Sequence, residues 1–356
     1  DAIIYDHLIK KNVVCPIKER TSKTETFVGA YVKEPITGFH DWVVSFDLNS
    51  LYPHLIMQYN ISPETIVGHK PDVSVDSLLT QEADLSELKE NNQTVTPNGT
   101  LYRKDKRGFL PELLEKIYLD RVHYKTLMLN AQQRKEEGED VGNEISKNLN
   151  IQMAKKIQLN SAYGALGNQW FRYFDLRNAE AVTTAGQLAI RWIENHLNDF
   201  LNKYLDTKDY DYVVAIDTDS VYLRLGKFVD KFIKTDDKNK ICDVIDKATR
   251  EAFEPSIDKS YEELADYVNA YEQKMDMGRE VIADKAVWTA KKRYALNVYD
   301  SEGVRYKTPR MKVMGMEIVK SSTPANVRGK LREAVNLMLT GNERQLQDLV
   351  HKYKKE

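Results

Sequence analysis

Two segments of this chain have the pattern of a buried strand that ends in an acidic residue. They are WVVSFD at residues 42–47 and YVVAID at residues 212–217. Asp219 and a second β-rich run at 220–223 follow the latter segment, so the pattern predicts a hairpin with acids at its turn. Taken singly, each acid is typical of a turn or of a helix cap. Taken together, the two strand ends predict a more specific chemistry.

Carboxylates that are held close together repel, and one of them takes up a proton unless a cation neutralises the pair. A hard divalent ion with oxygen ligands removes this repulsion, and Mg²⁺ typically takes one or two protein carboxylates together with substrate phosphates. Two such ions, roughly 4 Å apart, can hold the attacking and leaving oxygens of an in-line phosphoryl displacement. Asp47, Asp217 and Asp219 are therefore candidates for a site of phosphoryl-transfer chemistry.

The rest of the chain predicts an α+β fold in which a helical hairpin interrupts a sheet-based body. Apolar spacing predicts helices over residues 112–134, 143–163 and 179–205, of which the first two form a long hairpin. The polar, acidic residues 72–98 are expected to be a surface excursion that ends in a turn.

The C-terminal stretch predicts two short helices. Thr323 is a suitable N-cap and Pro324 a suitable first-turn residue. Residues 340–342 separate the two helical segments, and Leu346, Leu349 and Val350 have the spacing of a docking stripe in the second.

The predicted helical hairpin carries positive charge on one face. Arg121 and Lys125 are four residues apart, and Lys156, Asn160 and Tyr163 have i, i+4, i+7 spacing on the opposing helix. A triphosphate could bind these cations while a base and sugar pack against the ring of Tyr163. Spacing alone leaves a solvated basic helix face open as the alternative.

Charge is unevenly distributed over the 356 residues. The formal net charge of −2 does not indicate a nucleic-acid-binding protein. Basic residues nevertheless gather in residues 291–312 and 103–107, which suits either solvated faces or a protein that holds cations on carboxylates and DNA on lysines.

Four motifs resemble those of family B DNA polymerases, in the family's order. DLNSLYP at 47–53 resembles the first polymerase motif, residues 156–164 the second, DTDS at 217–220 the third, and KKRY at 291–294 the primer-binding motif. The sequences of residues 29–35 and 60–65 are similar to those of the T-even bacteriophage branch. The resemblance covers nearly the whole chain.

The resemblance implies roles for individual residues. Asp47, Asp217, Asp219 and Lys156 would be catalytic, with Asp47, the Leu48 carbonyl and Asp219 holding two Mg²⁺ ions, which Mn²⁺ could replace, and with Asp217 a weaker participant. Tyr52 would exclude a 2′-hydroxyl. The implied dNTP-binding residues are Leu51, Tyr52, Arg121, Lys125, Lys156, Asn160 and Tyr163. The implied DNA-binding residues are Gly29, Ala30, Gly164, Thr218, Lys291, Lys292, Arg293 and Tyr294.

The resemblance also implies an activity and an organisation. The activity is transfer of a deoxynucleoside monophosphate from a dNTP to a primer 3′-hydroxyl, with release of pyrophosphate, during phage DNA replication. The implied subdomains are a palm (1–107 and 169–318), a fingers hairpin (108–168) and the start of a thumb (319–356). The family's exonuclease domain and most of its thumb are expected to lie outside this stretch.

The implied partners are primer–template DNA, dNTPs, a polypeptide carrying the thumb, a region carrying the exonuclease, and a sliding clamp. The expected location is the cytoplasm of the infected bacterial host. No membrane association is expected, because no apolar run approaches the ~20 residues of a membrane helix.

Other function classes fit less well. Reverse transcriptases and RNA polymerases also place two acids on a hairpin, but the SLYP wording and the lysine-bearing helix argue against them. A P-loop ATPase requires a GxxxxGK motif, which the sequence lacks. A catalytically weak DNA-binding or assembly fragment, which needs a partner chain carrying the thumb, remains the alternative.

Overall fold

The computed structural model describes residues 1–18, 26–136 and 138–355 of the chain. It divides into two compact units that alternate along the sequence. Unit 1 comprises residues 1–30, 50–189 and 261–275, and unit 2 comprises residues 31–49, 190–260 and 276–356.

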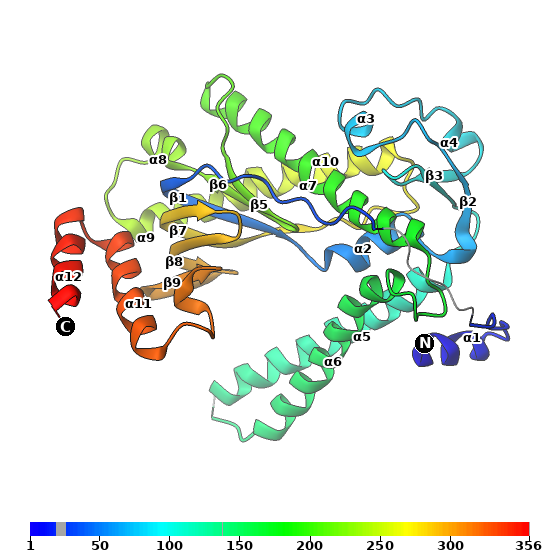
Figure 1. The fold of residues 1–356 in the computed structure, drawn as a ribbon, viewed down its shortest axis with the longest axis horizontal. Helices are drawn as coiled ribbons and strands as arrows, with labels where there is room; N and C mark the ends of the chain where they lie inside the picture. The colour runs from blue at the N-terminus through cyan, green and yellow to red at the C-terminus, as the bar shows by residue number, and fades with distance from the viewer. Residues whose placement is uncertain (19–25, 137, 356) are drawn as a thin grey trace. The chain divides into compact units, whose positions relative to one another are not determined.

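Unit 2 is built on a six-stranded antiparallel sheet (Figure 1). The strand order is β5-β6-β1-β7-β8-β9, so β1, early in the chain, lies in the middle of the sheet between β6 and β7. The strands are β1 (Gly38–Leu48), β5 (Val213–Asp217), β6 (Ser220–Arg224), β7 (Met277–Ala290), β8 (Arg293–Ser301) and β9 (Val304–Met314). Both acid-terminated strands are therefore confirmed, and so is the hairpin that joins β5 to β6.

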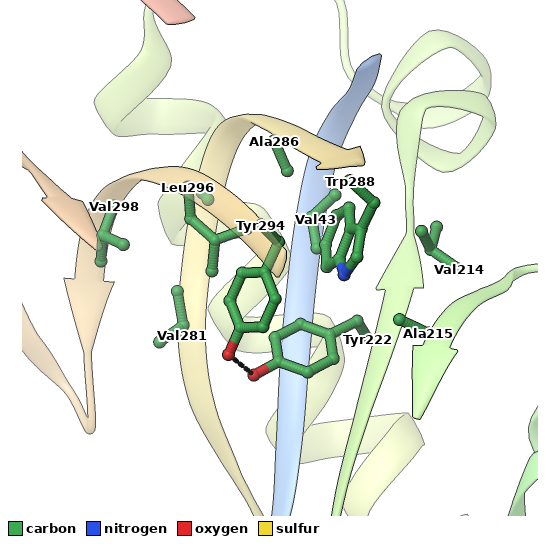
Figure 2. Packing of buried hydrophobic residues seen from close by; sticks show 11 residues of the cluster. Val43, Val214, Ala215, Tyr222, Val281, Ala286, Trp288, Tyr294, Leu296 and Val298 are labelled. Atoms are coloured by element: carbon green, nitrogen blue, oxygen red, sulfur yellow. Dashed lines mark hydrogen bonds between the residues drawn. The ribbon is translucent and has the colours of Figure 1, made fainter. Parts of the chain in front are cut away.

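The core of this sheet explains why its strands have continuous apolar runs. Val43 of β1, Val214 of β5 and Val281 of β7 are each no more than 2% exposed. Figure 2 shows the rings of Tyr222, Trp288 and Tyr294 gathered among these side chains. A strand that is covered on both faces loses the alternation of polar and apolar residues, as β1 does.

Helices complete unit 2. They include α8 (Gly226–Phe232), α9 (Lys238–Ala248), a π-helical turn η2 (Thr249–Phe253), a 3₁₀ turn η3 (Glu317–Val319), α11 (Ala325–Thr340) and α12 (Glu343–Lys355). The two predicted C-terminal helices are confirmed, although α11 begins one residue later than predicted, with Pro324 rather than Thr323 at the cap position. In α12, Leu349 is buried while Val350 is exposed, so only part of the predicted stripe is open to solvent.

Unit 1 contains a small sheet and most of the remaining helices. Its three strands, in the order β2-β4-β3, are β2 (Ile66–His69), β3 (Gln93–Val95) and β4 (Thr100–Arg103). Its short helices are α1 (Ala2–Lys10), α2 (Leu51–Gln58), η1 (Pro63–Thr65), α3 (Val75–Leu79) and α4 (Glu87–Glu90).

The expectation of a surface excursion over residues 72–98 is only partly right. The stretch holds α3, α4 and β3, and its apolar residues Leu78, Leu88 and Val95 are buried. Isolated leucines in a polar, acidic stretch give little periodicity, so the burial of these residues was not evident from the sequence. The turn that ends the stretch is present, with Gly99 in the left-handed region at φ 79°.

Long helices form the remainder. The predicted hairpin is confirmed as α5 (Phe109–Glu136) and α6 (Gly142–Leu166), which run side by side within unit 1 (Figure 1). The third predicted helix is α7 (Leu176–Leu205), and α10 (Glu254–Tyr267) follows later; each of these two contributes residues to both units.

The whole is a mixed α+β structure with antiparallel sheets, as the sequence predicted. In the described ranges, none of the helices combines the length and the apolar character that a membrane crossing requires.

Candidate active site

Unit 2 brings the predicted acids to one edge of its sheet. Asp47 pairs in register with Ser220, the residue that directly follows Asp219. The backbone N–H of Leu48 donates to the carbonyl of Asp219 over 2.8 Å. We call the three carboxylates of Asp47, Asp217 and Asp219 the carboxylate edge.

Local backbone irregularities shape this edge. The pairing of β1 with β7 shifts register between Ser45 and Phe46, just before Asp47. Such bulges bend a strand and change the direction of a side chain. In the hairpin turn, Thr218 has φ 62°, a conformation that is costly for a β-branched residue and that concentrates at functional sites. Its N–H donates to the carbonyl of Tyr31, 3.2 Å away, which fixes the turn.

The electrostatics of the edge are those of crowded carboxylates. Burial, with the negative charges of Asp219 and Glu280, raises the pKa of Asp47 to about 7. Burial, with the charges of Asp217 and Glu280, also raises the pKa of Asp219. Neighbouring negative charge therefore opposes ionisation of both Asp47 and Asp219, which is the condition that a bound cation relieves.

Glu280 was missed by sequence reasoning. It lies on β7, accepts hydrogen bonds from Ser45 Oγ (3.2 Å) and Lys312 Nζ (2.8 Å), and contributes to the shifts of both acids. No motif surrounds Glu280 in the sequence, and only the pairing of β7 with β1 brings it to the edge.

Asp217 differs from the other two acids because it has a cationic partner. Lys292 Nζ lies 3.0 Å from Asp217 Oδ1. This ion pair connects two regions that sequence analysis had singled out independently, the acidic hairpin and the basic KKRY motif.

The donor set of the edge fits Mg²⁺. Among the residues that the structure describes, no group of three His, Cys, Asp or Glu side chains is placed to enclose an ion. Zn²⁺ in a structural site and Ca²⁺ generally require fuller protein coordination, whereas Mg²⁺ keeps waters and substrate oxygens beside one or two carboxylates. Asp47 and Asp219, with the neighbouring Leu48 carbonyl, would supply oxygen ligands of this kind.

The predicted nucleotide-binding cations lie on the helix pair of unit 1. Lys125, Lys156 and Asn160 are exposed, and Arg121 is partly buried with its Nη1 3.3 Å from Ser50 Oγ. Within the described parts of the chain, neither Lys125 nor Lys156 has an acidic partner, whereas the adjacent Lys155 pairs with Asp120 over 2.7 Å. We call the surface formed by Arg121, Lys125, Lys156 and Asn160 the basic helix face.

Aromatic residues complete this region. The rings of Tyr52 and Tyr163 lie 4.5 Å apart between centroids, and a Cβ on Gly186 of α7 would meet Tyr52 Cε1 at 3.4 Å. Tyr52 is thus held between a second ring and a glycine. Leu51, by contrast, is buried, so its side chain packs in the interior of the unit.

The KKRY residues form the turn between β7 and β8 (Lys291 and Lys292) and the start of β8 (Arg293 and Tyr294), and all have partners in unit 2. Lys291 pairs with Glu34 (3.2 Å), Lys292 with Asp217, and Arg293 with Glu317 (2.6 Å). Tyr294 is buried, and its hydroxyl lies 2.7 Å from that of Tyr222, as the dashed line in Figure 2 shows. The first three are exposed enough to exchange partners, whereas Tyr294 is part of the core. We call Lys291–Tyr294 the basic turn.

The remaining predicted DNA contacts are at the surface of unit 1. Gly29, Ala30 and Gly164 are exposed. The carbonyl of Gly29 accepts a hydrogen bond from Gln187 Nε2 at 2.6 Å, which anchors this otherwise irregular segment to α7.

Comparison with known proteins supports the same interpretation as this geometry. A model of DNA polymerase family B matches residues 2–264. Over 96% of its length the chain is 39% identical to the DNA-directed DNA polymerase of Escherichia phage RB69, of which it covers 43%. Over its full length it is 36% identical to that of Enterobacteria phage T4, of which it covers 45%. A DNA polymerase of Pyrococcus glycovorans is 28% identical over 87% of the chain.

The chain thus spans less than half the length of the two phage relatives. The family match includes the strand that carries Asp47, the helix pair that carries Lys156 and the hairpin that carries Asp219. On this evidence the chain belongs to DNA polymerase family B.

Proposed function

We propose that this chain carries out template-directed DNA synthesis, in which a deoxynucleoside monophosphate is transferred from a dNTP to a primer 3′-hydroxyl and pyrophosphate is released. The observation that carries the proposal is the carboxylate edge. Asp47 at the end of β1 and Asp219 in the turn before the neighbouring strand β6 are partly buried, and burial with nearby negative charge raises the pKa of each, so a bound cation would favour their joint ionisation.

Each residue of the edge has a role in the proposal. Asp47, the Leu48 carbonyl and Asp219 would hold two Mg²⁺ ions, and Asp217, which pairs with Lys292, would contribute less directly. When bound, such ions activate the attacking hydroxyl and neutralise charge on the transferred phosphoryl group. Mn²⁺ would substitute, because it also prefers oxygen ligands.

The residues of unit 1 would select and hold the nucleotide. Arg121, Lys125 and Lys156 would bind the triphosphate, and Lys156 would deliver a proton to the leaving pyrophosphate oxygen. Tyr52 would stand against C2′ of the sugar, with its ring fixed by Tyr163 and Gly186. Asn160 and Tyr163 would complete the nucleotide site, and Leu51, whose side chain is buried, would contribute to it only through its backbone.

DNA would be held by residues of the basic turn, by Thr218 and by exposed residues of unit 1. Lys291, Lys292, Arg293 and Thr218 would meet the primer strand, with Tyr294 supporting them from the core. Gly29 and Ala30 would lie near the template strand, and Gly164 would also contact DNA. In the terms of the family, residues 1–107 and 169–318 would be the palm, 108–168 the fingers, and 319–356 the beginning of the thumb.

Single-nucleotide incorporation tests the proposal. A labelled primer is annealed to four templates that differ in the first unpaired base, and each is incubated with an excess of the chain, Mg²⁺ and one dNTP at a time. We expect extension only by the complementary nucleotide, and loss of extension in Asp219→Asn.

The matched control is Asp236→Asn, the same change at an exposed acid outside the carboxylate edge, which should extend like the wild type. Extension that ignores the template, or that persists in Asp219→Asn, would refute the proposed function. A polypeptide supplying the thumb is expected to increase extension by holding the duplex longer.

A further inference from the structure

The basic turn has an unusual backbone. Ala290 and Arg293 are paired across β7 and β8, so only Lys291 and Lys292 form the connection. Lys292 has φ 58°, in the left-handed region. Two-residue hairpins that require this conformation usually place Gly, Asn or Asp there. The presence of a lysine indicates that the surrounding structure holds the turn in place.

Gly315 provides the space in which this turn sits. It directly follows β9, whose last paired residue, Met314, lies opposite Tyr294. A Cβ built on Gly315 would overlap the carbonyl oxygen of Lys292 and would lie 3.0 Å from its carbonyl carbon. The obstacle is backbone rather than the end of a flexible side chain, so the turn itself would have to move.

The turn cannot move freely, because it is held from several directions. Arg293 is tied to Glu317, two residues beyond Gly315, and the Tyr294 hydroxyl bonds that of Tyr222 in the core (Figure 2). Displacing the turn away from Gly315 would strain these contacts and would shift Lys292 relative to Asp217, its partner at 3.0 Å.

Gly315 is therefore needed on two counts. Its own φ of 64° favours glycine, and the carbonyl of Lys292 occupies the volume that any side chain would need. The positive φ of Gly315 affects stability alone. The steric overlap with the Lys292 carbonyl would transmit any change at residue 315 to the position of the Lys292 ammonium.

We propose that Gly315 is a positioning residue for primer binding: by leaving room for the Lys292 carbonyl it sets the place of the basic turn, and through it the contact of Lys292 with the primer strand. This inference rests on the proposed function, because it takes the primer strand as the ligand of Lys292.

The test measures binding of a fluorescent primer–template to the chain by anisotropy, over a range of salt concentrations and without dNTP. Lys292→Gln should weaken binding and make the slope of log affinity against log salt shallower by about 0.9, the value for one lost phosphate contact. Gly315→Ala should reproduce both effects, with a loss of affinity of about threefold to tenfold.

A double-mutant cycle separates positioning from general destabilisation. If Gly315 acts through Lys292, the Gly315→Ala, Lys292→Gln double variant should bind no more weakly than Lys292→Gln alone. Two independent effects would instead add.

Gly303→Ala is the matched control. Gly303, in the turn between β8 and β9, also has positive φ (83°), but a Cβ there would meet nothing within 4 Å. It should lose stability, as Gly315→Ala does, while keeping the wild-type DNA affinity and salt slope. Gly315→Asn is a second variant, because Asn tolerates positive φ yet still carries the overlapping Cβ.

All binding is measured at a temperature at which circular dichroism shows each variant folded. Wild-type affinity and slope in both Gly315 variants, with Lys292→Gln weakened, would overturn the positioning role alone. An unchanged affinity in Lys292→Gln would instead overturn the proposed primer contact. The two failures are therefore distinguishable.

Discussion

The carboxylate edge and the basic helix face are built by different physical means. The edge is fixed by backbone: strand register, a bulge and a left-handed turn place the half-buried Asp47 and Asp219 before any ligand arrives. On the helix face, exposed side chains such as Lys125 and Lys156 project from two long helices. The edge therefore carries stored charge repulsion, whereas the helix face carries solvated charge. Substitutions should affect the two regions differently.

The largest effect is expected at the edge. Asp47→Asn and Asp219→Asn should each lower the rate of nucleotide addition by ~10³-fold or more, since an amide cannot supply the anionic ligand that the cations require. Rapid-quench single-turnover extension with Mg²⁺ measures this rate. A rate within a few-fold of the wild type in either variant would show that the edge is not the catalytic centre.

The helix face should respond residue by residue. Lys156→Met is expected to lower kcat/KM for the correct dNTP by ~10²-fold or more, through loss of a triphosphate contact and a proton donor. Lys155→Met, one residue away, removes an interhelical ion pair with Asp120 and should cost less than ~1 kcal/mol of stability with synthesis retained. Equal losses in both variants would mean that the helix, and not Lys156, is responsible.

A smaller effect is expected at Tyr52, the second residue of α2, which is the first helix after Asp47 in the sequence. Tyr52→Ala should reduce the ratio of dNTP to rNTP incorporation efficiency by about 10- to 100-fold, because the ring that blocks a 2′-hydroxyl is removed. Tyr163→Ala, which leaves the blocking ring but removes its neighbour, should change the ratio less. An unchanged ratio in Tyr52→Ala would identify Tyr52 as a packing residue.

The smallest effect concerns the repulsion at the edge. The pKa of Asp47 is raised to about 7 in the fold from an ordinary value of 3.8. Because the folded value is the higher one, the fold is favoured below about pH 4, and this contribution is lost as pH rises through about 7. A full shift would correspond to about 4 kcal/mol, and partial exposure reduces this to about 1–2 kcal/mol.

Urea denaturation of the wild type and Asp47→Asn, without divalent cations, measures this difference. Between about pH 4 and pH 7 the wild type should lose free energy of unfolding relative to the variant, and Mg²⁺ should restore it at the high-pH end. Parallel pH curves for the two proteins would contradict the account of the edge.

Much of this comparison could be predicted from the sequence, for reasons that differ between elements. The strand that ends in Asp47 was recognisable because it is buried on both faces and carries no charged residue between Trp42 and Phe46. The helices that carry Arg121 and Lys156 were recognisable because long periodic segments give a strong signal. The motifs themselves identified the four regions and the family.

What the sequence could not give is pairing across the sheet. The position of Glu280 and the Asp217–Lys292 ion pair depend on which strands are neighbours in the sheet. Local residue patterns do not indicate which strands pair. The same holds for the burial of Tyr294 beside Tyr222. Gly315 lies in a Met-Gly-Met stretch that matches no motif. Its importance can be recognised only from the turn that packs against it.

Binding of Mn²⁺ to the chain, followed by electron paramagnetic resonance, tests the central claim most directly, because it needs neither DNA nor catalysis. We expect the wild type to bind Mn²⁺ and Mg²⁺ to compete with it, and we expect Asp47→Asn and Asp219→Asn each to lose this binding while Asp236→Asn keeps it. Undiminished Mn²⁺ binding in a folded Asp47→Asn, Asp219→Asn double variant would contradict the account, since the carboxylate edge would then not be the cation site.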